Sequence, residues 1–184
     1  MTIPKVEYGT FSVLVITALD YLQLCEVSST LKLVNLSKPA IEIPRRLLNE
    51  HGAEVLQIYD SFVALWPCAQ EHPDARVLTA AMAIVAEIGP DGPNAFGRGV
   101  VRNGLSVGCA CGSVLYQRQN GRLINVLGAA IKRAEQLERL AKKRGAPLAV
   151  DSAIARLARE GTFTCVGDDS WELPSPAREG EADQ

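Results

Sequence analysis

The sequence lacks the features that would direct it to nucleic acid or into a membrane. Its 184 residues hold 19 lysines and arginines against 21 aspartates and glutamates, which gives a net charge of −2. No basic excess is therefore present for binding phosphate backbones or anionic lipids. No apolar run approaches the roughly 20 residues of a membrane span, and residues 1–8 lack the basic and apolar segments of a signal peptide. We expect a cytoplasmic location, no nucleic-acid partner and no membrane insertion.

Residues that form metal sites and disulfides are also few. Histidine occurs twice and cysteine five times, an odd number that favours reduced thiols over a disulfide framework. Cys109 and Cys111 lie two residues apart, on the same side of a predicted strand. A metal site would need two further ligands, so we interpret them as core thiols.

The composition is that of one globular domain. Hydrophobic residues make up 47% and charged residues 22% of the chain, which excludes a disordered protein. No internal repeat is present. We assign residues 11–173 to the domain, residues 1–10 to an N-terminal lead and residues 174–184, which are polar and contain two prolines, to a disordered tail.

The hydrophobic pattern predicts alternating strands and helices. The expected strands are 11–19, 53–59, 61–66, 99–102, 105–111, 123–127, 147–150, 162–167 and 170–173. The expected helices are two short ones within 21–49 that are broken near Pro39, then 73–88, 129–143 and 151–159. This order predicts an α+β, ferredoxin-like sandwich with a central, mostly antiparallel sheet. We expect the strand 11–19 to be covered on both faces, and helices 73–88 and 129–143 to cover one face.

Three segments carry a resemblance to a known family. They are residues 55–66 (VLQIYDSFVALW), 104–113 (GLSVGCACGS) and 126–140 (VLGAAIKRAEQLERL). In this order they resemble the hairpin, the strand with its turn, and the helix of the class III adenylate/guanylate cyclase catalytic domain. The resemblance extends over about residues 11–173 and implies a sandwich of the nucleotidyl cyclase type.

The family's chemistry requires a defined set of groups. Two aspartates hold two divalent ions for phosphoryl transfer, while a lysine and a second residue read the base. An asparagine orients the ribose, and an arginine stabilises charge on the phosphates. The resemblance also implies that these groups meet between two domains, so that each domain supplies part of the site.

Those functional positions fall on residues of different chemistry in this chain, with one exception. The exception is Asp60, which stands at the second metal-binding aspartate, although an aspartate at a hairpin tip is commonly a turn former. The first metal-binding aspartate, aligned through Tyr21, corresponds to Thr17. The other correspondences are Leu56 for the base-reading lysine, Ala129 for the second base-reading residue, Lys132 for the asparagine, Gln136 for the arginine, and Tyr59 for the glycine before Asp60.

The resemblance therefore implies a cyclase fold from which most of the chemistry is missing. We expect an inactive or strongly impaired domain, without a cofactor, that serves as a dimerising regulatory or interaction module in cyclic-nucleotide-type signalling. The expected partner is a second copy or a related cyclase domain, bound through an apolar surface at Leu56, Tyr59 and Phe62. We interpret Lys132 and Gln136 as a solvated helix face.

Two alternatives belong to other functional classes. The first is a divergent active cyclase in which Asp20 replaces Thr17 and Lys132 replaces the arginine, with Mg²⁺ or Mn²⁺ as cofactor. The second is a sensor that binds a nucleotide or another small ligand without turnover. Assays of turnover and of ligand binding discriminate between these alternatives and the interaction module.

Overall fold

The protein forms a single mixed sheet with helices on both faces. The computed structural model describes residues 5–17, 30–58, 61–69, 72–89 and 105–174. Within them the elements are β1 (Val6–Thr17), α2 (Thr30–Glu50), β2 (Glu54–Ile58), β3 (Ser61–Pro67), α3 (Arg76–Ile88), β4 (Ser106–Gln119), β5 (Arg122–Leu127), α4 (Ala129–Arg144), β6 (Leu148–Asp151), α5 (Ser152–Ala155), β7 (Thr164–Gly167) and β8 (Ser170–Glu172).

The strands follow the order β2-β3-β1-β4-β6-β8-β7, and β5 pairs with the free part of β4. β4 and β6 run parallel, and the other pairs of described strands are antiparallel. The predicted α+β sandwich with a mostly antiparallel sheet is confirmed. The predicted hairpin of β2 and β3 is confirmed as well.

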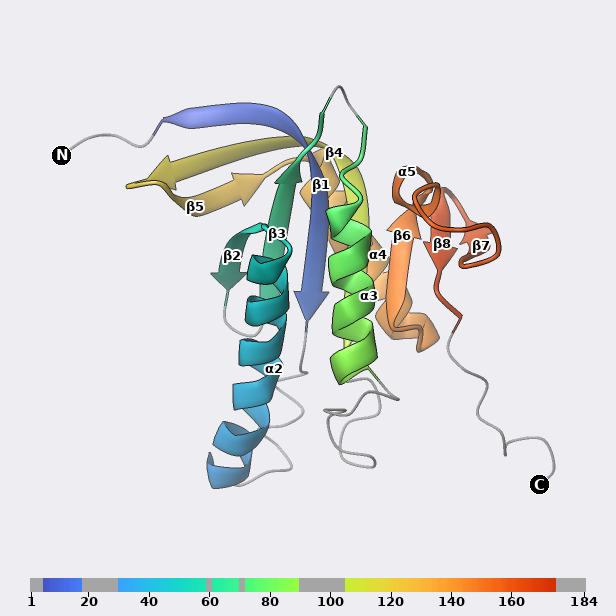
Figure 1. The fold of residues 1–184 in the computed structure, drawn as a ribbon, viewed down its shortest axis with the longest axis horizontal. Helices are drawn as coiled ribbons and strands as arrows, with labels where there is room; N and C mark the ends of the chain where they lie inside the picture. Colours follow the sequence, from blue (N-terminus) through green and yellow to red (C-terminus); the bar gives the residue numbers. More distant parts are fainter. Residues whose placement is uncertain (1–4, 18–29, 59–60, 70–71, 90–104, 175–184) are drawn as a thin grey trace.

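The central strand β1 is buried on both faces, as its apolar run predicts. Leu14 and Ile16 contribute to the first core cluster, beneath α2 and α3. Val13 and Val15 point to the opposite face and pack in the second cluster, beneath α4. Figure 1 shows α2 and α3 in front of the sheet and α4 behind it. The expectation that α3 and α4 share one face is therefore wrong, because a strand that is apolar on both faces needs a cover on each.

The helix α2 corrects a second expectation. It runs without interruption from Thr30 to Glu50 and includes Pro39 and Pro44, where we expected a break near Pro39. Each proline removes a backbone donor and disfavours the helix locally. Tertiary packing overrides this preference, because Leu47 and Leu48 are buried in the first core cluster.

Element boundaries differ from the sequence prediction at several places. β1 starts at Val6, so residues 6–10 belong to the sheet and not to an N-terminal lead. β4 continues to Gln119, well beyond the predicted end at residue 111, and α5 ends at Ala155 instead of residue 159. The expected strand 99–102 and tail residues 175–184 lie outside the described residues.

The contact between α4 and β4 is unusually close. A side chain at Gly108 in β4 would overlap the carbonyl oxygen of Ala134 and the backbone nitrogen of Glu138. At the start of α4, Gly128 has a φ of 154°, and a Cβ there would lie 2.5 Å from the carbonyl oxygen of Ser113. These two glycines allow the apolar stripe of α4 to reach the sheet.

Candidate functional site

The position of the first expected metal ligand lies in a row of hydroxyl groups. Thr17 ends β1 and is paired with Ser61 of β3 on one side and Ser106 of β4 on the other. The hydroxyls of Thr17 and Ser61 are 3.3 Å apart and hydrogen-bonded. Ser106 donates its hydroxyl to the buried carboxylate of Glu138 in α4. Within the described residues, the three positions paired at the end of β1 therefore carry neutral hydroxyls, and the buried carboxylate beside Ser106 is already bonded.

The second expected metal ligand, Asp60, and its neighbour Tyr59 lie outside the described residues. Their expected roles, a weak metal ligand and a contact to a partner, remain predictions. Among the residues that are described, no group of three or more histidines, cysteines, aspartates or glutamates is placed to hold a metal ion. Thr17 and its hydroxyl neighbours do not fit a site for two divalent ions, because such ions select carboxylate ligands.

Leu56, at the base-reading position, lies in apolar surroundings. It is half-buried against the second core cluster, together with Tyr116, Leu123 and Val126 of the β4–β5 hairpin. Side chains at this position are therefore covered by the chain's own hairpin.

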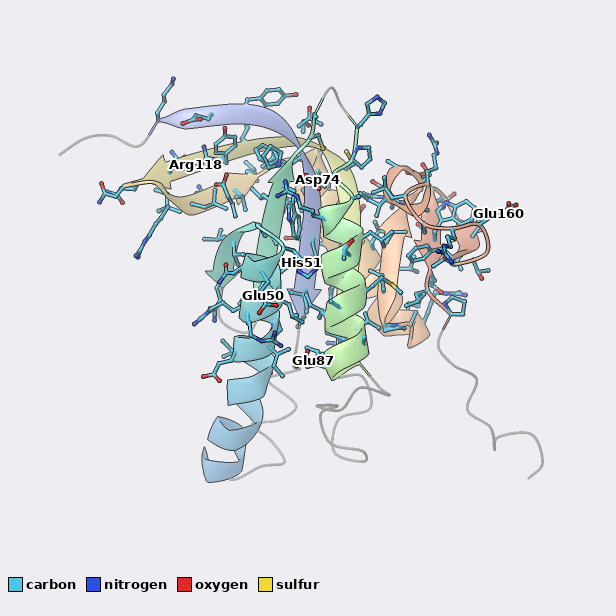
Figure 2. All side chains as sticks on the ribbon, in the orientation of Figure 1. Glu50, His51, Asp74, Glu87, Arg118 and Glu160 are labelled. Atoms are coloured by element: carbon cyan, nitrogen blue, oxygen red, sulfur yellow. The ribbon has the colours of Figure 1, made fainter. Side chains whose placement is uncertain are left out.

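One arginine holds this hairpin over β2. The Nε atom of Arg118 donates to Glu54 of β2 over 2.9 Å, and its guanidinium lies 4.5 Å from the ring centre of Tyr116. The hydroxyl of Tyr116 in turn donates to Glu7. Figure 2 shows Arg118 on the part of the sheet that extends beyond the helices. The contacts of Arg118 thus tie the β4 side of the hairpin to β2, the strand that carries Leu56.

Phe62 does not belong to a partner surface. Its side chain is fully buried in the first core cluster, whereas Leu56 belongs to the second cluster on the opposite face. The expected surface of Leu56, Tyr59 and Phe62 is therefore wrong for Phe62. The reason is strand alternation: Phe62 pairs with Ile16, and both side chains point towards α2 and α3.

The α4 positions are separate from those on the sheet. Ala130, Ala134, Leu137 and Ala141 are buried, as their spacing predicts, and Ala129, Lys132 and Gln136 are exposed. Because the buried stripe of α4 faces the sheet, its exposed stripe faces away from Thr17 and Leu56. The structure thus divides the expected site into two groups that do not converge within one chain.

Comparisons with solved structures identify the architecture. A bacterial light-regulated adenylyl cyclase has a TM-score of 0.68 and 18% identity, over 90% of this chain and 88% of that one. The guanylyl cyclase domain of the RhoGC fusion protein from the aquatic fungus Blastocladiella emersonii has a TM-score of 0.67 and 15% identity. The match covers 93% of this chain and 98% of that domain. The adenylyl cyclase CyaB from P. aeruginosa has a TM-score of 0.62 and 12% identity, and the match covers 95% of this chain and 98% of that chain. The chain has the fold of a class III cyclase domain.

Identities at this level establish the cyclase fold alone. No protein-family model matches the sequence, and no curated protein matches it. A longer chain of the bacterial light-regulated adenylyl cyclase is covered over 51% of its length, so this chain spans about half of that protein. The fold expected from the three sequence segments is confirmed.

The cyclase fold of this chain exposes an apolar strip that the sequence prediction missed. Tyr8 of β1, Leu115 of β4 and Leu127 of β5 are directly paired across the three strands. Their side chains are 70%, 41% and 68% exposed, and Val6 on the same side of β1 is 55% exposed. The signal was present in the alternation of β1 and β4. It was missed because the predicted strands began at residue 11 and ended at residue 111.

Proposed function

We propose that this chain is an inactive or strongly impaired nucleotidyl cyclase homology domain that acts as a dimerising regulatory or interaction module in cyclic-nucleotide-type signalling in the cytoplasm. The observation that carries the proposal is the row of hydroxyls around Thr17. Two-metal phosphoryl transfer depends on carboxylates that hold divalent ions, and a neutral threonine cannot supply the charge of a carboxylate. No cofactor is expected.

The other site positions support the same reading. Leu56 packs among apolar side chains, where a lysine would be needed to read a base. On the exposed stripe of α4, Lys132 and Gln136 stand in place of the asparagine and the arginine. Loss of a charge-stabilising arginine alone can cost on the order of 10³-fold in phosphoryl transfer. The combined changes leave little of the mechanism.

Pairing with a second copy or a related cyclase domain is supported by the exposed apolar strip of Val6, Tyr8, Leu115 and Leu127. Contiguous apolar surface of this kind is characteristic of interaction sites. Among the structural neighbours, the fungal guanylyl cyclase domain is described as a dimer in one crystal structure and as a monomer in another.

No helix in the described part of the chain has the length and apolar character to cross a bilayer.

A turnover assay tests the proposal. The purified chain is incubated with Mn²⁺ and either ATP or GTP, and we expect no cyclic nucleotide above the protein-free background. The Asp60→Ala variant is the matched control. Turnover by the unaltered chain that Asp60→Ala abolishes would overturn the proposal in favour of a divergent cyclase. Stabilisation by a nucleotide in a thermal-shift assay, without turnover, would identify a sensor.

Light scattering tests the pairing. We expect the unaltered chain to run as a dimer at high micromolar concentration and Leu127→Glu to weaken that dimer. Ile58→Glu on β2 is the comparison variant, because Ile58 is also exposed, at 50%, and lies next to the expected contact at Tyr59. A dimer weakened by Ile58→Glu and not by Leu127→Glu would assign the interface to the hairpin tip instead of the strip. A monomer for the unaltered chain, without a partner domain, contradicts the homodimer.

A further inference from the structure

Two thiols from different strands meet on the face of the sheet that carries the first core cluster. The Sγ atoms of Cys68 and Cys111 are 3.6 Å apart. Cys68 directly follows β3, and its backbone N–H donates to the carbonyl of Thr10 in β1. Cys111 lies in β4, opposite Ser12 of β1. Both cysteines are half-buried, so the pair is in contact with solvent and is not sealed in the core.

The backbone arrangement does not suit a disulfide. The strand β1 runs between the two cysteines, and neighbouring strands are spaced about 4.8 Å apart. Two such spacings place the backbones of Cys68 and Cys111 roughly 9 to 10 Å apart, whereas a disulfide requires Cα atoms within about 7 Å. The sulfurs meet beside Ser12 of β1, whose Oγ lies 3.5 Å from the sulfur of Cys68 and whose backbone pairs with that of Cys111. An atom that bridges the sulfurs fits this arrangement better than a bond between them.

Two sulfur ligands restrict which metal ion can bridge Cys68 and Cys111. Zinc needs four ligands, and no cluster of three or more conventional metal ligands occurs among the described residues. Soft thiolate ligands favour monovalent copper, which accepts two sulfurs. We propose that Cys68 and Cys111 form a two-thiolate site for a soft, thiophilic cation, with monovalent copper as its representative.

The sulfur separation is compatible with such an ion. Two metal–sulfur bonds of about 2.3 Å place the two sulfurs about 4.6 Å apart in a linear arrangement. The separation of 3.6 Å therefore requires the sulfurs to move apart by about 1 Å, which side-chain rotation supplies. No backbone shift is required.

Binding is a proton exchange without a redox change. One Cu⁺ displaces a proton from each thiol, and the complex of two thiolates and Cu⁺ carries one negative charge. The carboxylate of Asp151 accepts the backbone N–H of Cys111 over 2.7 Å and so fixes the backbone at this ligand.

A competition titration tests the site on the full chain. The reduced protein is titrated anaerobically with Cu⁺ against a chromophoric chelator of monovalent copper. We expect one ion per chain, with an ultraviolet sulfur-to-copper charge-transfer band. Cys68→Ser and Cys111→Ser should each weaken binding at least tenfold. Cys165→Ser is the matched control, because Cys165 is an exposed thiol on β7, and it should leave binding unchanged.

Three results would overturn the site. They are the absence of Cu⁺ binding, binding that Cys68→Ser leaves intact, and quantitative formation of a Cys68–Cys111 disulfide under mild oxidation with diamide. Circular dichroism of each variant establishes that it is folded, and Cys68→Ala replaces any serine variant that is not. The readouts do not depend on nucleotide turnover, so this inference and the proposed function succeed or fail separately.

Discussion

The α4–β4 contact and the end of β1 share one face of the sheet, yet they differ in how closely they follow the cyclase pattern. At the α4–β4 contact, Gly108 and Gly128 stand within the segments that resemble the family, and each allows a close approach of backbones. At the end of β1, Thr17 stands where the resemblance places a metal ligand, and it bonds with Ser61. The first region leaves no room for a side chain at either glycine, whereas the second is joined by a single half-buried side-chain hydrogen bond. We therefore expect the fold to depend more strongly on the first region than on the second.

The largest effect is expected from Gly108→Ala. Its methyl group would overlap the backbone of α4 at Ala134, so the helix must move away from the sheet. We expect a loss of at least about 3 kcal/mol in the free energy of unfolding, measured by chemical denaturation. Gly9→Ala in β1 is the control, because its Cβ would meet the edge of the Phe11 ring, 2.9 Å away, which is a side chain that can shift. Equal stability of the two variants would show that the close approach of backbones at Gly108 places no special constraint on the fold.

Glu138→Ala is expected to rank second. Glu138 is buried and accepts the hydroxyl of Ser106, so its removal leaves a buried donor without a partner. The expected cost is about 1 to 3 kcal/mol. Glu135→Ala on the same helix breaks an exposed pair with Arg139, and its cost should stay within about 0.5 kcal/mol. Thermal unfolding of both variants measures the difference.

The pH dependence of stability provides a third test at the sheet. Burial raises the pKa of Asp151 above its ordinary value of 3.8, so the folded state holds this proton to a higher pH than the unfolded chain does. Stability from this group is therefore lost as the pH rises above 3.8, by at most about 1.4 kcal/mol per pH unit. Asp151→Asn removes this slope. We therefore expect the stability of the unaltered protein, relative to that of Asp151→Asn, to fall as the pH rises above 3.8. A relative stability of the unaltered protein that rises with pH would contradict the assignment.

The smallest effect is expected from Thr17→Ala. The substitution removes one hydrogen bond to Ser61, 3.3 Å long, and we expect it to cost less than about 1 kcal/mol. Ser61→Ala should match it, since it removes the same bond. Denaturation curves measure both variants. A loss above 2 kcal/mol would show that the end of β1 is as important for the fold as the α4 contact.

The sequence predicted the fold where local pattern and packing agree. The continuous apolar run in β1 and the apolar stripe of α4 with Leu137 indicated buried surfaces, and both are buried. It failed where tertiary contacts override local preference, as in the continuous helix through Pro39 and Pro44. It also failed where an element extends past its apolar run, as β4 does towards Gln119.

The sequence predicted where the candidate site residues stand along the chain, but it predicted less well which side chains surround them in the fold. Thr17 and Gln136 could be placed by resemblance, but their surroundings depend on strand register and on the exposed stripe of α4. Phe62 shows the limit most clearly, because one residue of shift along β3 decides whether a side chain points to a partner or into the core.

The central place of β1 also has a consequence for synthesis. β1 leaves the ribosome before its two neighbours in the sheet, β3 and β4, which begin at Ser61 and Ser106. At about 5 to 20 residues per second, the β4 side of this apolar strand stays unpaired for roughly 5 to 20 s. During that interval it can pair with the strand of another nascent chain. Slower translation between residues 68 and 105 should therefore lower the soluble yield without changing the stability of the finished protein.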